Sequence, residues 1–254
     1  MDYIKATQDL RNIGYIQISQ ALINKFNVHY EFQLAQEHES QLEDAYQYFK
    51  TGLEALEKFE RVCKENFDNY HELKGDIKNL MLGVKEISIF YSEKYGGKAV
   101  DILDTDGPGN PYEEILNWTQ EDILDLRAMI DALNSRQVVI RMKARINEKL
   151  ESEKSKLAKL QSGKKSFGQL FSKKSKEDQA LAVESDIKKS EEEIESCNTI
   201  VKIVTARLIK EDINEFKQSK SKHFEDKMKI FIDASLKDYN HFINEAKHLE
   251  SNLN

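Results

Sequence analysis

The chain has 254 residues, of which 38 are Lys or Arg and 45 are Asp or Glu, giving a formal net charge of −7. Hydrophobic residues make up 39% and charged residues 33%, whereas globular domains carry about 45–50% and about 25%. With only 2 prolines and 10 glycines, this composition indicates long helices with narrow apolar seams rather than a thick globular core. The net charge argues against binding of the chain as a whole to nucleic acid or an anionic membrane.

No stretch of about 18 apolar residues occurs, so the sequence predicts no membrane-spanning helix. The first residues, Met1 to Lys5, lack the basic region and apolar block of a secretory signal. The two cysteines, Cys63 and Cys197, have neither a zinc-site nor a redox-motif spacing, which favours a reducing compartment. We therefore expect a cytoplasmic protein.

In chain order, the first candidate element is residues 1–26, which carry little charge. Its apolar positions are Ile4, Leu10, Ile13, Ile16 and Leu22. The pattern fits either an amphipathic helix at a membrane interface or a helix packed against the rest of the chain. We treat residues 1–26 as an N-terminal amphipathic helix and residues 27–254 as the main domain.

Two clusters of turn residues divide the main domain into three long segments. Both prolines fall in the loop of residues 96–111, and a second break spans residues 163–168. The sequence predicts helices over about residues 27–95, 112–161 and 177–251, and no alternating strand pattern. Short connections between long helices imply antiparallel neighbours, so the predicted fold is all-α, an elongated antiparallel three-helix bundle.

The apolar residues form seams with the spacing of long packed helices. Ile187, Ile194 and Val201 recur every seven residues, which is typical of a coiled coil. The seams at residues 115–139 and 216–249 are wider than three helices can cover. They favour a homodimer or a heterodimer.

Three glycines, Gly52, Gly75 and Gly83, lie inside the first long helix. Each costs about 1 kcal/mol relative to alanine in a helix interior. We interpret them as marking a bend or a close helix crossing.

The sequence contains no catalytic, cofactor or metal-binding motif, so we expect neither an enzyme nor a cofactor or metal site. The six histidines are scattered along the predicted helices. The acidic run at residues 191–195 is interpreted as a solvated helix face opposite Ile187 and Ile194. An all-helical enzyme is therefore the least favoured function class.

Charge is distributed unevenly along the chain. Residues 136–176 contain 13 basic and three acidic side chains, a net charge of +10, and the remainder of the chain carries −17. Each Lys or Arg near an anionic membrane contributes about 1 kcal/mol, and this attraction decays within a Debye length. A local basic patch can therefore bind a membrane that repels the whole molecule.

The predicted membrane-binding residues all lie in this basic segment. They are Arg141, Lys143, Arg145, Lys149, Lys154, Lys156, Lys159, Lys164, Lys165, Phe167, Leu170, Phe171, Lys173, Lys174 and Lys176. Phe167, Leu170 and Phe171 have helical spacing between flanking lysines, as in an interfacial segment, although the same spacing fits a loop tucked onto the helix ends. No aromatic platform or recognition-helix pattern accompanies the lysines, so nucleic acid is not an expected partner.

The final long helix resembles the last BAR-domain helix of sorting nexins, in which phenylalanines follow charged residues. Here those positions are Glu215-Phe216 and Lys222-His223-Phe224. The loop Phe167-Gly-Gln-Leu-Phe-Ser-Lys-Lys is similar to the loop before that helix, nearest to the sorting nexin 4 branch. The resemblance extends from about Trp118 to Leu249.

The resemblance implies a crescent-shaped BAR dimer that senses or stabilises curved membrane, acts peripherally on endosomes and coats tubules. Its partner would be an anionic membrane, including one that contains phosphoinositides. The chain contains no segment resembling the PX domain of sorting nexins, so their phosphoinositide specificity is not carried over. The alternative is an elongated coiled-coil scaffold or tether that binds protein partners without touching lipid.

Overall fold

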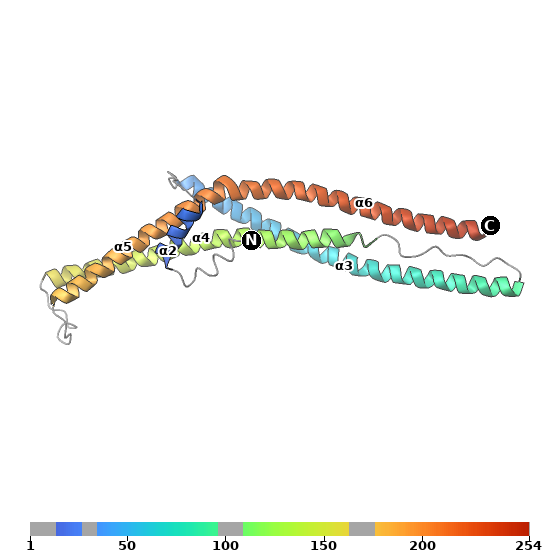
Figure 1. Cartoon of the computed structure of the whole chain (residues 1–254), viewed down its shortest axis with the longest axis horizontal. Coiled ribbons are helices and arrows are strands. Elements are labelled where there is room, and N and C mark those ends of the chain that lie inside the picture. The colour runs from blue at the N-terminus through green and yellow to red at the C-terminus, as the bar shows by residue number, and fades with distance from the viewer. Residues whose placement is uncertain (1–13, 27–34, 96–108, 163–175, 254) are drawn as a thin grey trace. The chain divides into compact units, whose positions relative to one another are not determined.

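The computed structural model describes residues 14–26, 35–95, 109–162 and 176–253, which are almost entirely helical (Figure 1). The helices are α2 (Tyr15–Phe26), α3 (Gln36–Tyr95), α4 (Tyr112–Gln161), α5 (Lys176–Arg207) and α6 (Ile213–Leu253), with a π-helical turn, η3 (Leu208–Asp212), between the last two. Since the described residues contain no strand, the prediction of an all-α fold is confirmed.

The beginnings of α3 and α4 are fixed by side chains that cap the helix ends. His38 Nδ1 accepts a hydrogen bond from the backbone N–H of Ala35 at 3.0 Å, reaching back to the residue before α3 as in a capping box. Asn110 Oδ1 accepts from the N–H of Tyr112 at 3.0 Å, and Pro111 lies directly before α4, where its missing N–H costs nothing.

The segment predicted as one helix over residues 177–251 is helical throughout but contains the turn η3. Arg207 before this turn and Ile213 after it keep ordinary α-helical backbone angles. A π-helical turn needs no glycine or proline, so the sequence pattern gave no sign of it.

The chain forms two compact units, and α3, α4 and the α5–α6 helix each contribute to both. Unit 1 comprises Met1–Phe49 and Ala128–Glu215, and unit 2 comprises Lys50–Arg127 and Phe216–Asn254. Each unit is described below by itself.

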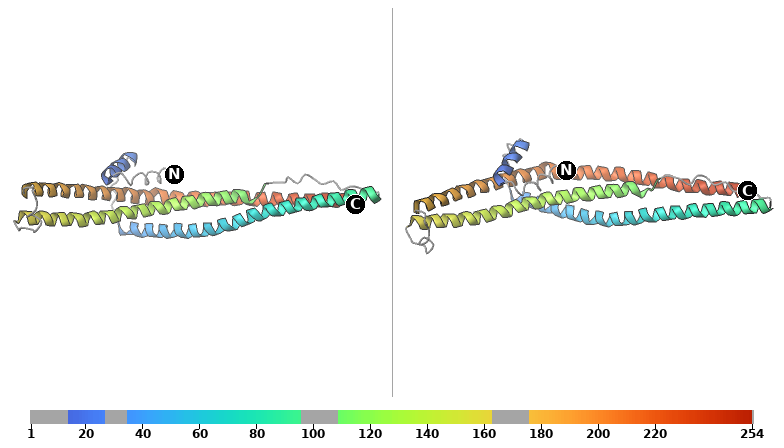
Figure 2. Two further views of the ribbon diagram at one scale, coloured as in Figure 1. Left: turned by 90° about the horizontal axis from the view of Figure 1, so that it is seen from below. Right: turned by 60° about the horizontal axis from the view of Figure 1, so that its bottom comes forward.

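In unit 1, α4 and α5 run side by side in opposite directions, as both views of Figure 2 show. Ser190 donates to Glu153 at 3.1 Å, and Arg136 donates to Thr205 at 2.6 Å, so the α5 number rises as the α4 number falls. From Ser196 to Ala206 most residues of α5 are buried, because α4 and α2 cover different sides of it.

In unit 2, α4 lies antiparallel to both α3 and α6. Gln120 and Arg127 of α4 donate to Glu60 and Glu57 of α3, so the α3 number falls as the α4 number rises. Lys220 and Lys227 of α6 donate to Asp122 and Glu114 of α4, which gives the same opposite direction for α6. Because both neighbours oppose α4, α3 and α6 run parallel to each other. The core contains Cys63, Ile115 and Trp118, and the Trp118 ring contacts Phe59 edge-on.

The glycines of α3 do not share the role expected of them. A Cβ atom added at Gly52 would lie 3.5 Å from a methyl group of Leu126, which is ordinary van der Waals contact. At Gly75 and Gly83 nothing lies within 4 Å, so no described residue makes a close helix crossing there.

Candidate functional site

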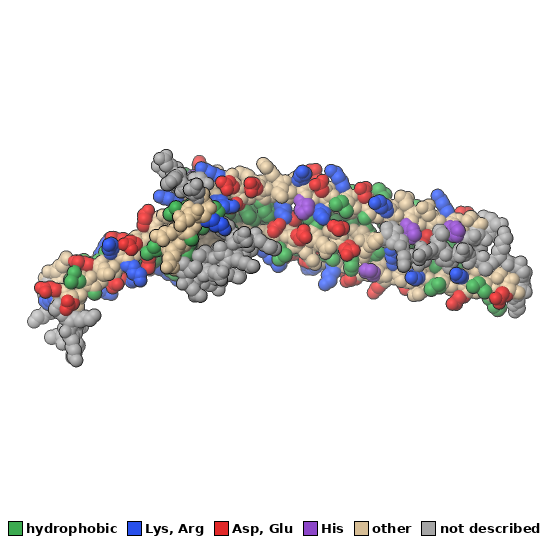
Figure 3. Space-filling model, viewed as in Figure 1, with side chains coloured by type: hydrophobic (Ala, Val, Ile, Leu, Met, Phe, Trp, Pro, Cys, Tyr) green, Lys and Arg blue, Asp and Glu red, His purple; other side chains and the backbone are tan. Residues whose placement is uncertain are grey.

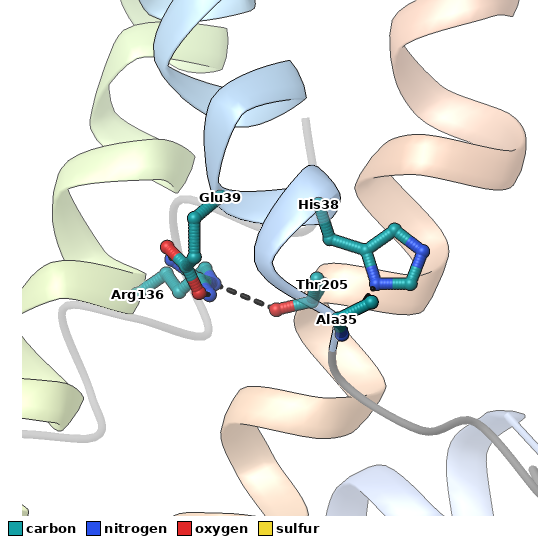
Figure 4. A network of polar contacts seen from close by, with 5 residues as sticks. All are labelled: Ala35, His38, Glu39, Arg136 and Thr205. Atoms are coloured by element: carbon teal, nitrogen blue, oxygen red, sulfur yellow. Dashed lines mark hydrogen bonds and ion pairs between the residues drawn. The ribbon is translucent and has the colours of Figure 1, made fainter.

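Arg136 begins the basic segment, but it is not available to a ligand. Its side chain is only 1% exposed, and its guanidinium forms a two-pronged ion pair with Glu39 while Nε donates to Thr205 (Figure 4). A buried guanidinium needs such partners because its five donors have lost water. This cluster fastens the first turn of α3 to α4 and α5 and has a structural role.

Five of the predicted membrane-binding residues form one exposed row along α4, which we name the α4 basic stripe. Its members are Arg141, Arg145, Lys149, Lys156 and Lys159. Steps of three, four and seven residues return to one face of a helix, so the row follows the helix axis. The opposite face of α4 carries the buried Ile146 and Leu150.

Two further predicted lysines of α4 lie away from this row. Lys143 is half-buried, and Lys154 pairs with Glu191 of α5 at 3.2 Å. Within the stripe, Lys149 also lies 3.4 Å from the carboxylate of Glu153. These ion pairs offset part of the predicted basic charge with neighbouring carboxylates.

The remaining predicted residues fall mostly beyond the described part of the chain. Lys176 is the exposed first residue of α5. The others, Lys164, Lys165, Phe167, Leu170, Phe171, Lys173 and Lys174, lie outside the described residues.

Packing alters the electrostatics that were counted along the sequence. Residues 141–161 of α4 and 176–200 of α5 together carry ten basic and eleven acidic side chains, because α5 contributes eight acids. Figure 3 shows red acidic and blue basic side chains interspersed on the visible face of this helix pair. The described end of unit 1 is therefore nearly neutral, with its positive charge concentrated on the α4 basic stripe.

A second surface lies in unit 2, and its α6 half falls within the seam at residues 216–249 that the sequence analysis marked as too wide for three helices to cover. The α3–α6 apolar face comprises eight exposed side chains: Leu73, Leu80, Val84 and Ile87 on α3, and Ile232, Leu236, Tyr239 and Ile243 on α6. Leu80 is 68% exposed and Tyr239 is 66% exposed. Exposed apolar side chains in this number mark an interaction site.

The two halves of this face lie on the same side of the α3–α6 pair. Tyr70 donates to Asp238, so these two residues mark the sides on which the helices meet. The rotations are counted at 100° per residue and viewed from the N-terminal ends of the helices. Around α3, the apolar row lies about 70° anticlockwise from Tyr70. Around α6, the apolar row lies about 130° clockwise from Asp238. Because the helices are parallel, these opposite rotations bring both rows to one side. The α6 row is level with residues 64–75 of α3, so the two rows follow one another along the helix pair.

The cysteine thiols are buried in separate units. Burial raises the pKa of Cys63, and burial together with the nearby Glu193 raises the pKa of Cys197 against the opposing effect of Lys143. Both thiols are therefore poor nucleophiles at neutral pH. Among the described residues, no three His, Cys, Asp or Glu side chains lie close enough to hold a metal ion.

No helix in the described ranges is both long enough and apolar enough to cross a membrane. In the comparisons with known proteins, no protein-family model and no curated protein sequence matches this chain.

Proposed function

We propose that this chain is a dimeric peripheral module of BAR type that binds anionic membrane and senses or stabilises its curvature. The observation that carries the proposal is the α4 basic stripe, five exposed cations in one row on a single helix face. A straight row can meet a lipid surface with several charges at once, and their attractions add within a Debye length.

The setting of this activity rests on the resemblance to sorting-nexin BAR domains. It places the protein on endosomal membranes, where crescent-shaped dimers of elongated antiparallel three-helix bundles form tubules during protein sorting. The lysines and aromatic residues at 164–174 would add to the membrane contact.

The dimer is supported by the α3–α6 apolar face. Residues 80–91 of α3 include apolar side chains on every side of the helix, a pattern typical of helices that are covered all round. Helix α4 begins at Tyr112 and does not extend along residues 80–91 of α3. Among the described residues, only α6 is available as a neighbour to this part of α3. A second copy would cover the exposed rows.

Sedimentation with vesicles tests lipid binding. We expect the chain to sediment with phosphatidylserine-containing vesicles but not with neutral ones, and to do so less at higher salt. The double variant Arg145→Glu, Lys156→Glu should bind at least about 30-fold more weakly, since each stripe cation contributes about 1 kcal/mol.

A matched control has the same change in net charge elsewhere. Lys64 and Lys229 are exposed residues of unit 2, and replacing both by Glu should leave binding close to that of the parent chain. Equal losses in the two double variants, or binding indifferent to salt, would refute the lipid site.

A scaffold or tether without lipid contact is the second candidate. It is favoured by the near-neutral charge of the described α4–α5 pair, which weakens long-range attraction to a membrane. No sedimentation with acidic vesicles, combined with retained dimerisation, would select this alternative.

A further inference from the structure

Helix α2 covers one side of α5 with a single apolar face. Tyr15, Ile18, Leu22 and Phe26 are spaced by three and four residues and therefore share that face. Tyr15 lies near Glu193 and Cys197, and Phe26 lies against Arg207, so the two helices run parallel.

The last turn of α2 is held by Arg207. The guanidinium carbon lies 4.4 Å from the centre of the Phe26 ring, within the range of a cation–π contact. Arg207 Nε also donates to the two carboxylate oxygens of Asp212 at 3.1 and 3.2 Å. The arginine thus connects α2 to the helix that α2 covers.

The π-helical turn η3 makes this connection possible. In a regular α-helix, residues five positions apart point about 140° away from each other, so Asp212 could not reach Arg207. A turn with hydrogen bonds between residues five apart brings them onto one side. The bulge thereby holds the guanidinium in a fixed orientation against Phe26.

The contact between α2 and α5 is small compared with the core beneath it. Only Ile18 and Ser19 of α2 are buried, and a helix of 12 residues is marginal on its own in water. Beneath it, Cys197 is fully buried, and Val201 and Val204 are buried as well. Elements with few buried contacts open at much lower free energy than the core.

We propose that α2 is a strap that opens without unfolding the rest of unit 1, and that the Phe26–Arg207 contact is its latch. Opening uncovers the side of α5 that includes Cys197 and frees the apolar face of α2. The strap therefore controls access to the apolar surface that α2 and α5 bury against each other.

The two cysteines provide an internal comparison for testing the strap. The full chain is treated with a small thiol-reactive reagent, and peptide mass spectrometry follows Cys197 and Cys63 separately. Local opening of α2 should label Cys197 faster than Cys63, which lies in the unit 2 core. Low urea concentrations should hardly change the Cys197 rate, because local opening exposes little surface.

Phe26→Ala should raise the labelling rate of Cys197 by about tenfold, the effect of weakening the latch by about 1.4 kcal/mol, without changing the rate of Cys63. Arg207→Lys keeps the positive charge beside Asp212 but loses the planar group that stacks on the ring, and should also speed Cys197 labelling. Asn24→Ala, on the exposed side of α2, is the matched control and should have no effect.

Three results would overturn the proposal. One is labelling of both cysteines at a common rate that rises with urea, which indicates global unfolding. Another is equal acceleration by Phe26→Ala and Asn24→Ala. The third is a labelling rate of Cys197 in Arg207→Lys that equals the rate in the parent chain. Circular dichroism and the fluorescence of Trp118, the single tryptophan, verify that each variant remains folded.

Discussion

At the scale of single residues, two of the polar contacts between distant parts of the chain, one in each unit, have opposite patterns of burial. In unit 1 the buried Arg136 is paired with Glu39, whose side chain is 50% exposed. In unit 2 the Tyr70 hydroxyl donates to the buried Asp238. The two contacts differ in which partner water can reach, and this difference determines what each substitution costs.

The Glu39–Arg136 pair should respond asymmetrically to substitution. Glu39→Gln leaves the buried guanidinium without its counter-charge and should lower the free energy of unfolding by about 2–3 kcal/mol. Arg136→Met should cost only about 1 kcal/mol, because the half-exposed Glu39 carboxylate can be hydrated and the Thr205 hydroxyl can bond within its own helix. Urea unfolding followed by far-UV circular dichroism measures both values. A larger loss for Arg136→Met would contradict this account.

The Tyr70–Asp238 contact should make stability depend on pH in the alkaline range. Burial first, then the hydrogen bond to Asp238 and its negative charge, raise the pKa of Tyr70 well above its ordinary value. Above pH about 10 the unfolded chain loses this proton while the folded chain keeps it. The contribution of Tyr70 to the free energy of unfolding should therefore be complete below pH about 10. Above that pH, this contribution should fall by at most about 1.4 kcal/mol per pH unit.

Comparison with Tyr70→Phe isolates this contribution from those of the other tyrosines and the lysines. Urea unfolding of both chains between pH 9 and 11 is expected to show a steeper decline for the parent chain. The variant should also be less stable at neutral pH, because Asp238 loses its donor. Parallel declines in the two chains would mean that Tyr70 does not titrate differently on folding.

At the scale of elements, the sequence predicts what depends on local signals. Few helix breakers and seven-residue seams predict the all-α fold, and Asn110 with Pro111 marks the start of α4. The turn η3 carries no such signal, because its residues are compatible with an ordinary α-helix. For a related reason the sequence does not predict which glycine of α3 lies at a close helix crossing, since a glycine indicates permitted conformations rather than contacts, and at Gly75 and Gly83 no such crossing is found.

The site illustrates the same limit more sharply. Spacing alone predicts that Arg145 and Lys156 share a face of α4, because that depends only on helix geometry. Spacing cannot predict that Arg136 is buried against Glu39, or that the acids of α5 lie beside the lysines of α4. These features depend on the register between helices, which side-chain packing fixes in three dimensions.

At the scale of the whole molecule, the net charge of −7 describes no single surface. The basic charge that remains exposed in unit 1 is a row on one helix, while unit 2 presents a mainly apolar face. The proposed binding to a lipid surface and the proposed binding to a second copy of the chain thus depend on different residues. Their contributions can be separated by substitution, and the apolar face provides the sharper test.

Charging the α3–α6 apolar face should produce a folded monomer. Leu80→Glu with Ile87→Glu places two carboxylates in the surface that a second copy would bury, and the dimer should weaken by at least about 100-fold. Leu124→Glu with Leu181→Glu makes the same chemical change at exposed leucines of α4 and α5 and should leave the dimer intact. Sedimentation velocity over a range of concentrations measures both.

For the parent chain, the melting temperature should also rise with concentration, because association stabilises the folded state. This dependence should vanish in the Leu80, Ile87 variant. A parent chain that is monomeric at every concentration would exclude the dimer, and dissociation of the Leu124, Leu181 control would show that added charge, rather than this face, is responsible.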